Sequence, residues 1–171
     1  RPARSLRFRL DADLTGSLRS LAAGNQATLF MVLHAGFALL LSRWSGQTDV
    51  VVGTPIANRT REDLAGLIGC FVNTLALRLD LSGNPSGRDL IGRARSVTLD
   101  AYAHQDAPFE LVVDALGLKR SLTHTPLFQA MMVLQNAPGG RLELPGLSVT
   151  PLTDEASAAR FDVMLTMVEN G

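Results

Sequence analysis

The sequence predicts an α/β protein in which helices pack on a mixed β-sheet. Segments with the apolar pattern of strands alternate along the chain with segments that have helical spacing. The 171 residues suit a single domain with a substantial core. A hydrophobic share of 46% and a charged share of 19% are ordinary for a globular protein.

The first part of the chain predicts a strand and two helices. In residues 5–10 apolar side chains alternate with arginines, a pattern typical of a half-buried strand. Residues 12–23 carry leucines at helical spacing, and Gly24 suits the left-handed conformation that ends a helix. Thr28 is expected to cap the next helix, which runs to about Trp44. This helix is apolar nearly all round, so we expect it to lie between layers.

The middle of the chain predicts two strands separated by a short helix. Gly46 stops the second helix, and the β-branched run 49–57 then predicts a strand buried on both faces. Residues 60–67 suit a short helix, and residues 69–81 suit a second strand.

The second half begins with two helices whose ends carry recognisable signals. Ser86 and Asp89 resemble a capping box, and the helix that follows keeps its apolar spacing to residue 101. Pro108 is expected to open a shorter helix that Gly117 ends. Three strands are then predicted, at residues 127–136, 147–152 and 160–168.

Composition argues against several classes of partner. The formal net charge is zero, with no basic stripe to follow phosphates, so we predict no nucleic acid. The longest apolar run, 29–41, is too short to cross a bilayer, so we predict no membrane span. With a single cysteine, Cys70, no internal disulfide can form, and the start of the chain lacks a signal-peptide pattern. A cytoplasmic location is therefore expected.

The histidines do not form a recognisable site. His34, His104 and His124 neither adjoin one another nor take zinc-ligand spacing with the cysteine, so no metal site is predicted. We expect His34 to be a hydrogen-bonded core histidine. Because no nucleophile elbow or phosphate loop is found, no catalytic residue is predicted.

Asn73 is a polar residue within an apolar strand pattern. Alternation places it on one face with Phe71, Leu75 and Leu77. A buried amide must be hydrogen-bonded or it costs about 1–3 kcal/mol. Two interpretations are open: Asn73 bonds a neighbouring loop, or it faces a ligand tunnel or a partner surface.

Three segments resemble successive motifs of the condensation domains of nonribosomal peptide synthetases. They are IGCFVNTLALR (68–78), AHQDAPFE (103–110) and RSLTHTPLFQAMMVLQN (120–136). The stretch from 28 to 59 resembles the same family. The resemblance implies one lobe of a chloramphenicol acetyltransferase-like, two-lobed fold, with residues 1–171 forming a single domain, the C-terminal lobe, truncated at both ends. The family's His-His-x-x-x-Asp-Gly active-site motif belongs to the other lobe, and this chain has no His-His pair.

The resemblance also implies a function for the whole domain, which joins two carrier-bound aminoacyl or peptidyl thioesters through an amide bond. Its implied partners are the N-terminal lobe and the upstream and downstream carrier domains. No cofactor is bound directly, and the phosphopantetheine arms of the carriers enter a tunnel between the lobes. This lobe would supply tunnel wall and docking surface. The candidates for polar groups facing the tunnel are Thr54, Asn73 and Arg120.

Other residues of these motifs are expected to be structural: Arg78, Gln105, Asp106, Pro108 and Pro126. Asp106 precedes a helix start, where a carboxylate accepts backbone N–H groups, so we expect it to cap that helix. A tunnel role for Asp106 is the alternative.

Two function classes are therefore open. The first is the non-catalytic half of an amide-forming enzyme, inactive when isolated. The second is a stand-alone binding module of acyltransferase-like fold. We also expect the isolated chain to self-associate as a homodimer through residues 135–160, which contain exposed apolar residues in this interpretation.

Overall fold

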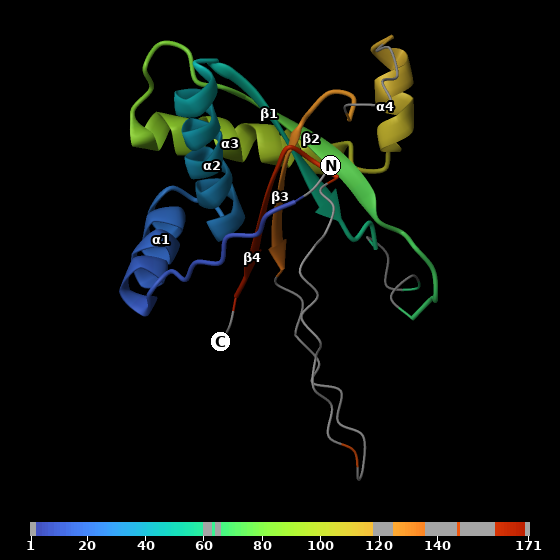
Figure 1. Ribbon diagram of the computed structural model, residues 1–171, viewed down its shortest axis with the longest axis horizontal. Helices are drawn as coiled ribbons and strands as arrows, with labels where there is room; N and C mark the ends of the chain where they lie inside the picture. Colours follow the sequence, from blue (N-terminus) through green and yellow to red (C-terminus); the bar gives the residue numbers. More distant parts are fainter. Residues whose placement is uncertain are drawn as a thin grey trace.

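The computed structural model describes residues 3–59, 63, 66–117, 125–135, 147 and 160–169, which contain four helices and four strands (Figure 1). The central strand β1 (Asp49–Ile56) pairs antiparallel with β2 (Asn73–Asp80) and parallel with β3 (Ala130–Gln135). Strand β4 (Val163–Val168) pairs parallel with β3, so the sheet order is β2-β1-β3-β4. The predicted mixed sheet is confirmed.

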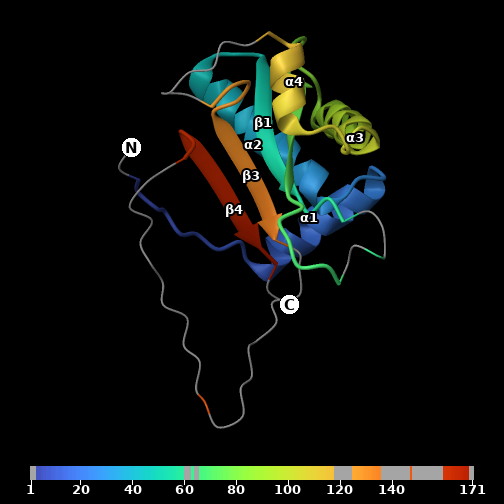
Figure 2. The same ribbon diagram turned by 90° about the vertical axis from the view of Figure 1, so that its right-hand side faces the viewer.

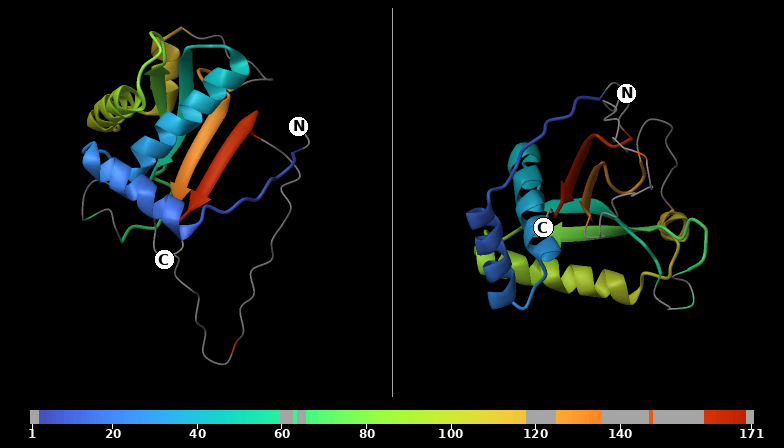
Figure 3. Two further views of the ribbon diagram at one scale, coloured as in Figure 1. Left: turned by 90° about the vertical axis from the view of Figure 1, so that its left-hand side faces the viewer. Right: turned by 90° about the horizontal axis from the view of Figure 1, so that it is seen from below.

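One face of the sheet is covered by helices. Helices α2 (Leu29–Ser45) and α3 (Gly87–Ala103) pack there, and α1 (Ala12–Gly24) lies against α2 (Figure 3). The pairing register sets alternate strand residues on this face, where they form the core with both helices. Its most deeply buried members include Val52, Leu77, Leu79, Ala94 and Met132.

The short helix α4 (Phe109–Ala115) stands apart from the other helices. It lies on the other side of β2 from α1 and α2, beyond the end of α3 (Figures 1 and 2). Its connection to α3 is the five-residue loop 104–108. This placement brings the loop to the point where β2 begins.

Several predicted helix ends are confirmed. Thr28 caps α2 by accepting the Met31 N–H at 3.3 Å, and Gly46 ends the helix in a left-handed conformation with φ of 72°. Ser86 and Asp89 form the expected capping box of α3. At the end of α1, the prediction that Gly24 takes the left-handed conformation was wrong. Gln26 takes that conformation instead, with φ of 52°.

Two larger predictions were wrong. Residues 5–10 form no strand, because no neighbouring strand among the described residues lies close enough to pair with them. Helix α2 is not enclosed between layers in the described structure. One side is buried, while Leu39, Leu40 and Trp44 are exposed.

Other predictions differ in their bounds or cannot be placed. Strand β2 begins at Asn73, and the preceding residues 66–72 are irregular. The predicted strand 147–152 and most of the predicted helix 60–67 lie outside the described residues.

Within the described ranges, no single helix is long and apolar enough to cross a membrane. Helices α1 and α2 would be long and apolar enough only as a pair, and the pair is bent by 104°.

Candidate functional site

Asn73 joins the start of β2 to the loop between α3 and α4. Its amide nitrogen donates to the carbonyl oxygens of Gln105 at 2.9 Å and Ala107 at 2.8 Å. Its side-chain oxygen accepts the N–H groups of Thr74 at 2.8 Å and Phe109 at 3.1 Å. Since both amide protons are donated and the oxygen accepts twice, these four bonds use the side chain's ordinary hydrogen-bonding capacity.

The bond from Phe109 explains how α4 begins. Pro108 occupies the N-cap position of α4 and makes no side-chain capping bond. Instead, Asn73 accepts the first N–H of the helix from 36 residues earlier in the chain. The predicted capping by Asp106 is therefore wrong, because the acceptor comes from β2 and the Asp106 side chain is not the cap.

Phe128, from the third motif (120–136), packs near the start of α4. It is only 2% exposed, and its ring lies 5.5 Å from that of Phe109 and 5.8 Å from that of Phe161, centre to centre. A methyl group at Gly53 would come within 2.2 Å of this ring, so glycine is required in the middle of β1. We name Asn73, Gln105, Phe109 and Phe128 the motif corner, because they bring all three motifs together.

A tight turn precedes Phe128. The Phe128 N–H donates to the Pro126 carbonyl at 2.9 Å, and Leu127 between them has a φ of 74°. Such a left-handed conformation is uncommon for a residue with a branched side chain. Pro126 thus has a visible structural contact. Arg120 and His124, of the same motif, lie outside the described residues.

Thr54 lies near Asn73 on the helix-covered face of the sheet. The register pairs Thr54 with Leu75 and Ile56 with Asn73, so the two polar residues are diagonal neighbours on adjacent strands. Thr54 is only 3% exposed, whereas Asn73 is half-buried. Of these two candidates, Asn73 is the one with surface accessible to a partner.

Arg78 lies at the other end of β2 and on the other face. Its guanidinium makes a two-pronged contact with Asp49, with Nε–Oδ1 and Nη2–Oδ2 distances of 2.9 and 2.7 Å. This bond holds the pKa of the Asp49 carboxyl below its usual value. Both side chains are largely exposed, so the pair contributes little to stability.

The described histidines do not supply a base to the motif corner. His34 is fully buried in α2, and neither of its ring nitrogens has a hydrogen-bond partner among the described residues. The predicted hydrogen bonding of His34 is therefore wrong, although its burial is confirmed. His104 ends α3, with its ring Nδ1 2.9 Å from the Asp100 carbonyl oxygen. Nor do the described Cys, His, Asp and Glu side chains gather into a metal-binding group.

The motif corner can therefore position chain segments, and the described histidines supply it with no base. Sequence reasoning identified Asn73 and Gln105 but missed Phe109, Phe128 and Gly53. The aromatic residues stood inside quoted motifs, yet nothing in a single sequence says that they touch. Gly53 had a weaker signal, as a glycine interrupting a β-branched run.

Comparison with known proteins identifies both the fold of this chain and its sequence family. The mixed sheet and its helices resemble solved condensation domains, whose fold is chloramphenicol acetyltransferase-like, as expected. The sequence profile of the Condensation domain family matches residues 2–171. The chain therefore belongs to the Condensation domain family.

The curated relatives are peptide synthetases. The chain is 50% identical over 162 residues to one of the linear gramicidin synthase proteins of Brevibacillus parabrevis, and 50% identical over 159 residues to malpinin synthetase of Mortierella alpina. These matches cover 94% and 93% of this chain but only 2% of either synthetase. The chain thus spans a small part of these relatives.

The similar solved structures belong to the same family, but their sequence identity to this chain is lower. The X-domain from teicoplanin biosynthesis aligns with a TM-score of 0.83 and 30% identity, covering 94% of this chain and 36% of that one. A four-domain nonribosomal peptide synthetase bound to AMP and glycine aligns with a TM-score of 0.74 and 30% identity, covering 77% of this chain and 10% of that one.

Proposed function

We propose that this chain is the C-terminal lobe of a condensation domain that forms amide bonds in a nonribosomal peptide synthetase. In this proposal residues 1–171 are one domain, cut at both ends. The observation that supports it best is the family match over residues 2–171, combined with 50% identity to a linear gramicidin synthase.

The reaction would take place between two carrier-bound thioesters. The acceptor amine attacks the donor thioester carbonyl, so that a C–N bond forms and a C–S bond breaks. The donor thiol leaves, and the amine loses a proton. The proposed partners are the N-terminal lobe and two carrier domains, whose phosphopantetheine arms hold the reactants. Alignment of two reactants contributes up to about 7–11 kcal/mol, which suits a lobe that positions rather than reacts.

Asn73 would act as a positioning residue in this domain. Three of its four bonds hold loop 104–108 and α4 against the start of β2. We propose that this loop borders the substrate tunnel and that Asn73 shapes it from behind. Thr54 and Arg120 stay candidates for the tunnel wall, while Gln105, Pro108, Pro126 and Arg78 are proposed to be structural.

The test uses the complete condensation domain with loaded donor and acceptor carriers, and follows amide product by mass spectrometry. We expect product with the native domain. Asn73→Ala should raise the apparent KM for the carriers or lower kcat, while Asp106→Ala should leave both unchanged. A complete domain that binds both loaded carriers but makes no amide would contradict the proposal.

A second candidate function is a binding module without catalysis. It is favoured by the alignment with the teicoplanin X-domain, which another solved structure shows in complex with OxyB. Co-purification of a protein partner by a complete domain that forms no amide would support this alternative. The higher identity to peptide synthetases favours the condensing function.

The compartment is also a proposal. Cys70 is an exposed free thiol, which suits a reducing compartment and therefore the cytoplasm. Fractionation of the producing cells tests this location.

A further inference from the structure

The connection between β1 and β2 is a loop whose two ends meet. Ile56, the last residue of β1, pairs with Asn73, the first residue of β2. The structure describes residues 57–59, 63 and 66–72 of this connection. Loops of this closed kind frequently carry function. Residues 66–72, which we name the returning limb, contain the beginning of the first motif.

Arg59 joins the outgoing part of the loop to the returning limb. Its Nη2 donates to the carbonyl oxygens of Leu67 at 2.9 Å and Gly69 at 3.3 Å. Its guanidinium carbon lies 4.4 Å from the centre of the Phe71 ring, which is a cation–π contact. Asn58 has a φ of 50°, so the chain bends in a left-handed conformation immediately before Arg59.

These contacts require the shape of an arginine side chain. A guanidinium is planar, so its edge can donate to carbonyl oxygens while its face lies on an aromatic ring. A lysine ammonium has three donors but no planar face that could stack on a ring. Lysine at position 59 could therefore keep hydrogen bonds to the limb but could not reproduce the stacked arrangement over Phe71.

Arg59 also accounts for the irregular shape of the returning limb. The sequence pattern predicted a strand from residue 69, yet β2 begins only at Asn73. No described strand pairs with the limb, and its carbonyl oxygens at Leu67 and Gly69 accept from Arg59 instead. In this conformation Leu67 is 50% exposed and Ile68 is fully exposed. The limb therefore displays two apolar side chains at a fixed place.

The returning limb ends at the motif corner. Asn73 directly follows Val72 and bonds the backbone of loop 104–108. Two irregular segments, the returning limb and loop 104–108, thus meet at one residue, and each is held by a side chain from another part of the chain. Irregular segments fixed on a rigid scaffold are the usual setting of binding residues.

We propose that Arg59 is a positioning residue of the condensation reaction. By fixing the returning limb, it places Leu67 and Ile68 as a second border of the tunnel beside loop 104–108. This inference rests on the proposed function. It assigns Arg59 to the binding of carrier-bound substrates rather than to the formation of the amide bond.

The kinetic test uses the complete condensation domain with loaded donor and acceptor carriers. Arg59→Leu should raise the apparent KM for the carriers at least about fivefold and change kcat less than about twofold, because the limb supplies contact surface. Arg59→Lys should give a smaller rise in KM, since it keeps the donors but not the stacking. Ile68→Ser should raise KM as well, because it removes a displayed apolar side chain while Arg59 stays in place.

Limited digestion of the same domain with chymotrypsin measures the hold of Arg59 without any reaction. The rate of cutting after Phe71, followed by mass spectrometry, reports how often the returning limb opens. We expect this rate to be at least about fivefold higher in Arg59→Leu than in the native domain. It should be unchanged in Ile68→Ser, whose fully exposed side chain does not hold the limb.

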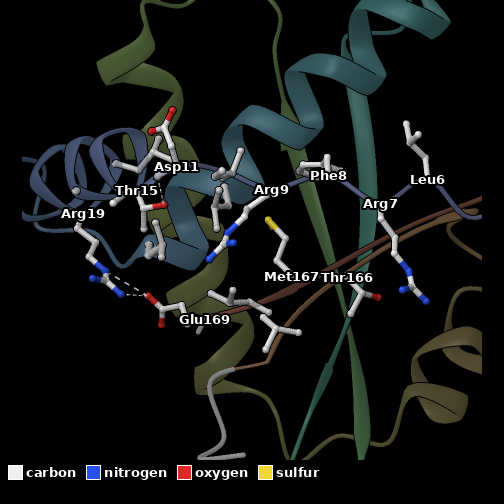
Figure 4. Close-up of a pocket in the computed structure, with 18 residues that line it drawn as sticks. Leu6, Arg7, Phe8, Arg9, Asp11, Thr15, Arg19, Thr166, Met167 and Glu169 are labelled. Carbon is white, nitrogen blue, oxygen red and sulfur yellow. Dashed lines mark hydrogen bonds and ion pairs between the residues drawn. The ribbon is translucent and has the colours of Figure 1, made fainter. Parts of the chain in front are cut away.

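Arg19→Leu is the matched control. Arg19, in α1, forms an ion pair with Glu169, just after β4, with an N–O distance of 2.7 Å (Figure 4). Like Arg59→Leu, this change removes an arginine with a visible partner, but in another part of the molecule. Exposed ion pairs contribute little to stability, so we expect neither KM nor the rate of cutting after Phe71 to change.

Three results would overturn the proposal. The first is an unchanged cutting rate in Arg59→Leu, since Arg59 would then not hold the limb. The second is an unchanged KM in an Arg59→Leu domain that is cut faster, since the limb would then have no part in binding. The third is an unchanged KM in Ile68→Ser. A native domain that makes no amide would overturn the proposed function and with it the kinetic role, while the digestion would still decide whether Arg59 holds the limb.

Discussion

A single amide side chain, Asn73, holds together two segments that lie far apart in the sequence. The Asn73→Ala variant would leave two carbonyl oxygens and two N–H groups without their partner. Because the site is half-buried, we expect the free energy of unfolding to fall by about 2 kcal/mol, measured by urea denaturation.

Asp106→Ala is the matched control, since Asp106 lies in the same loop but does not cap α4. We expect a change of at most about 0.5 kcal/mol, as for an ordinary surface substitution. If Asp106→Ala cost as much as Asn73→Ala, our assignment of the α4 cap to Asn73 would fail.

His34 makes the stability of the protein depend on pH. Burial lowers its pKa from 6.5 to about 4. Between these values the unfolded chain binds a proton that the folded chain does not, so stability is full above pH 6.5 and declines as the pH falls toward 4. This contribution is about 3 kcal/mol over the whole window.

The His34→Leu variant should remove that pH dependence of stability, because leucine is similar in size to histidine but does not titrate. Thermal unfolding of both proteins between pH 7 and pH 4 checks this, with His104→Gln as the control for an exposed histidine. Equal losses of Tm in the His34→Leu variant and the native chain would show that other groups cause the decline.

At the scale of the element, β1 depends on the absence of one side chain. Gly53→Ala would place a methyl group 2.2 Å from the ring of Phe128, which is fully enclosed and cannot easily move aside. We expect a loss of about 1–3 kcal/mol in the free energy of unfolding, as for other overpacked cores. Combining it with Phe128→Leu should cost less than the sum of the two single changes.

Gly92→Ala provides the contrast within a helix. Gly92 lies inside α3, and an added methyl group would meet nothing within 4 Å. Alanine restricts the unfolded chain more than glycine does, so we expect stabilisation by about 0.5–1 kcal/mol. Calorimetry of the two glycine variants should therefore show Tm shifts of opposite sign.

At the scale of the whole molecule, the chain should not form amide bonds by itself. It has no His-His pair, which the resemblance implies is the active-site motif of the whole domain. Mass spectrometry of the chain incubated with loaded carriers should find only the uncatalysed background. Product that increases in proportion to the concentration of the chain would contradict this expectation.

Self-association of the chain stays a prediction. The segment 135–160 lies almost entirely outside the described residues, but Met164 and Val168 on β4 are each 55% exposed beside the open edge. Exposed apolar residues and unpaired edges favour association. Sedimentation at micromolar concentration should show a dimer, and a strictly monomeric chain would exclude it.

Much of the fold could be read from local patterns. Continuous β-branched residues predicted β1, and the capping signals of Thr28 and Ser86 located the starts of α2 and α3. Of the candidate site, the polar position Asn73 was found because it broke an apolar alternation. These signals act between residues close in sequence, where hydrogen-bond geometry and side-chain spacing are dictated by the chain itself.

What the sequence by itself determined was therefore the class, the ends of α2 and the start of α3, the strands of the core and the family. The tertiary structure alone decided that Asn73 caps α4, that Phe128 packs on Gly53, and that residues 5–10 stay unpaired beside β4. The physical reason is that each depends on a partner distant in sequence: a cap needs an acceptor, a close contact needs a second surface, and a strand needs a neighbour. Local periodicity predicts that a segment is suited to such a partner, and only the folded chain determines whether one is there.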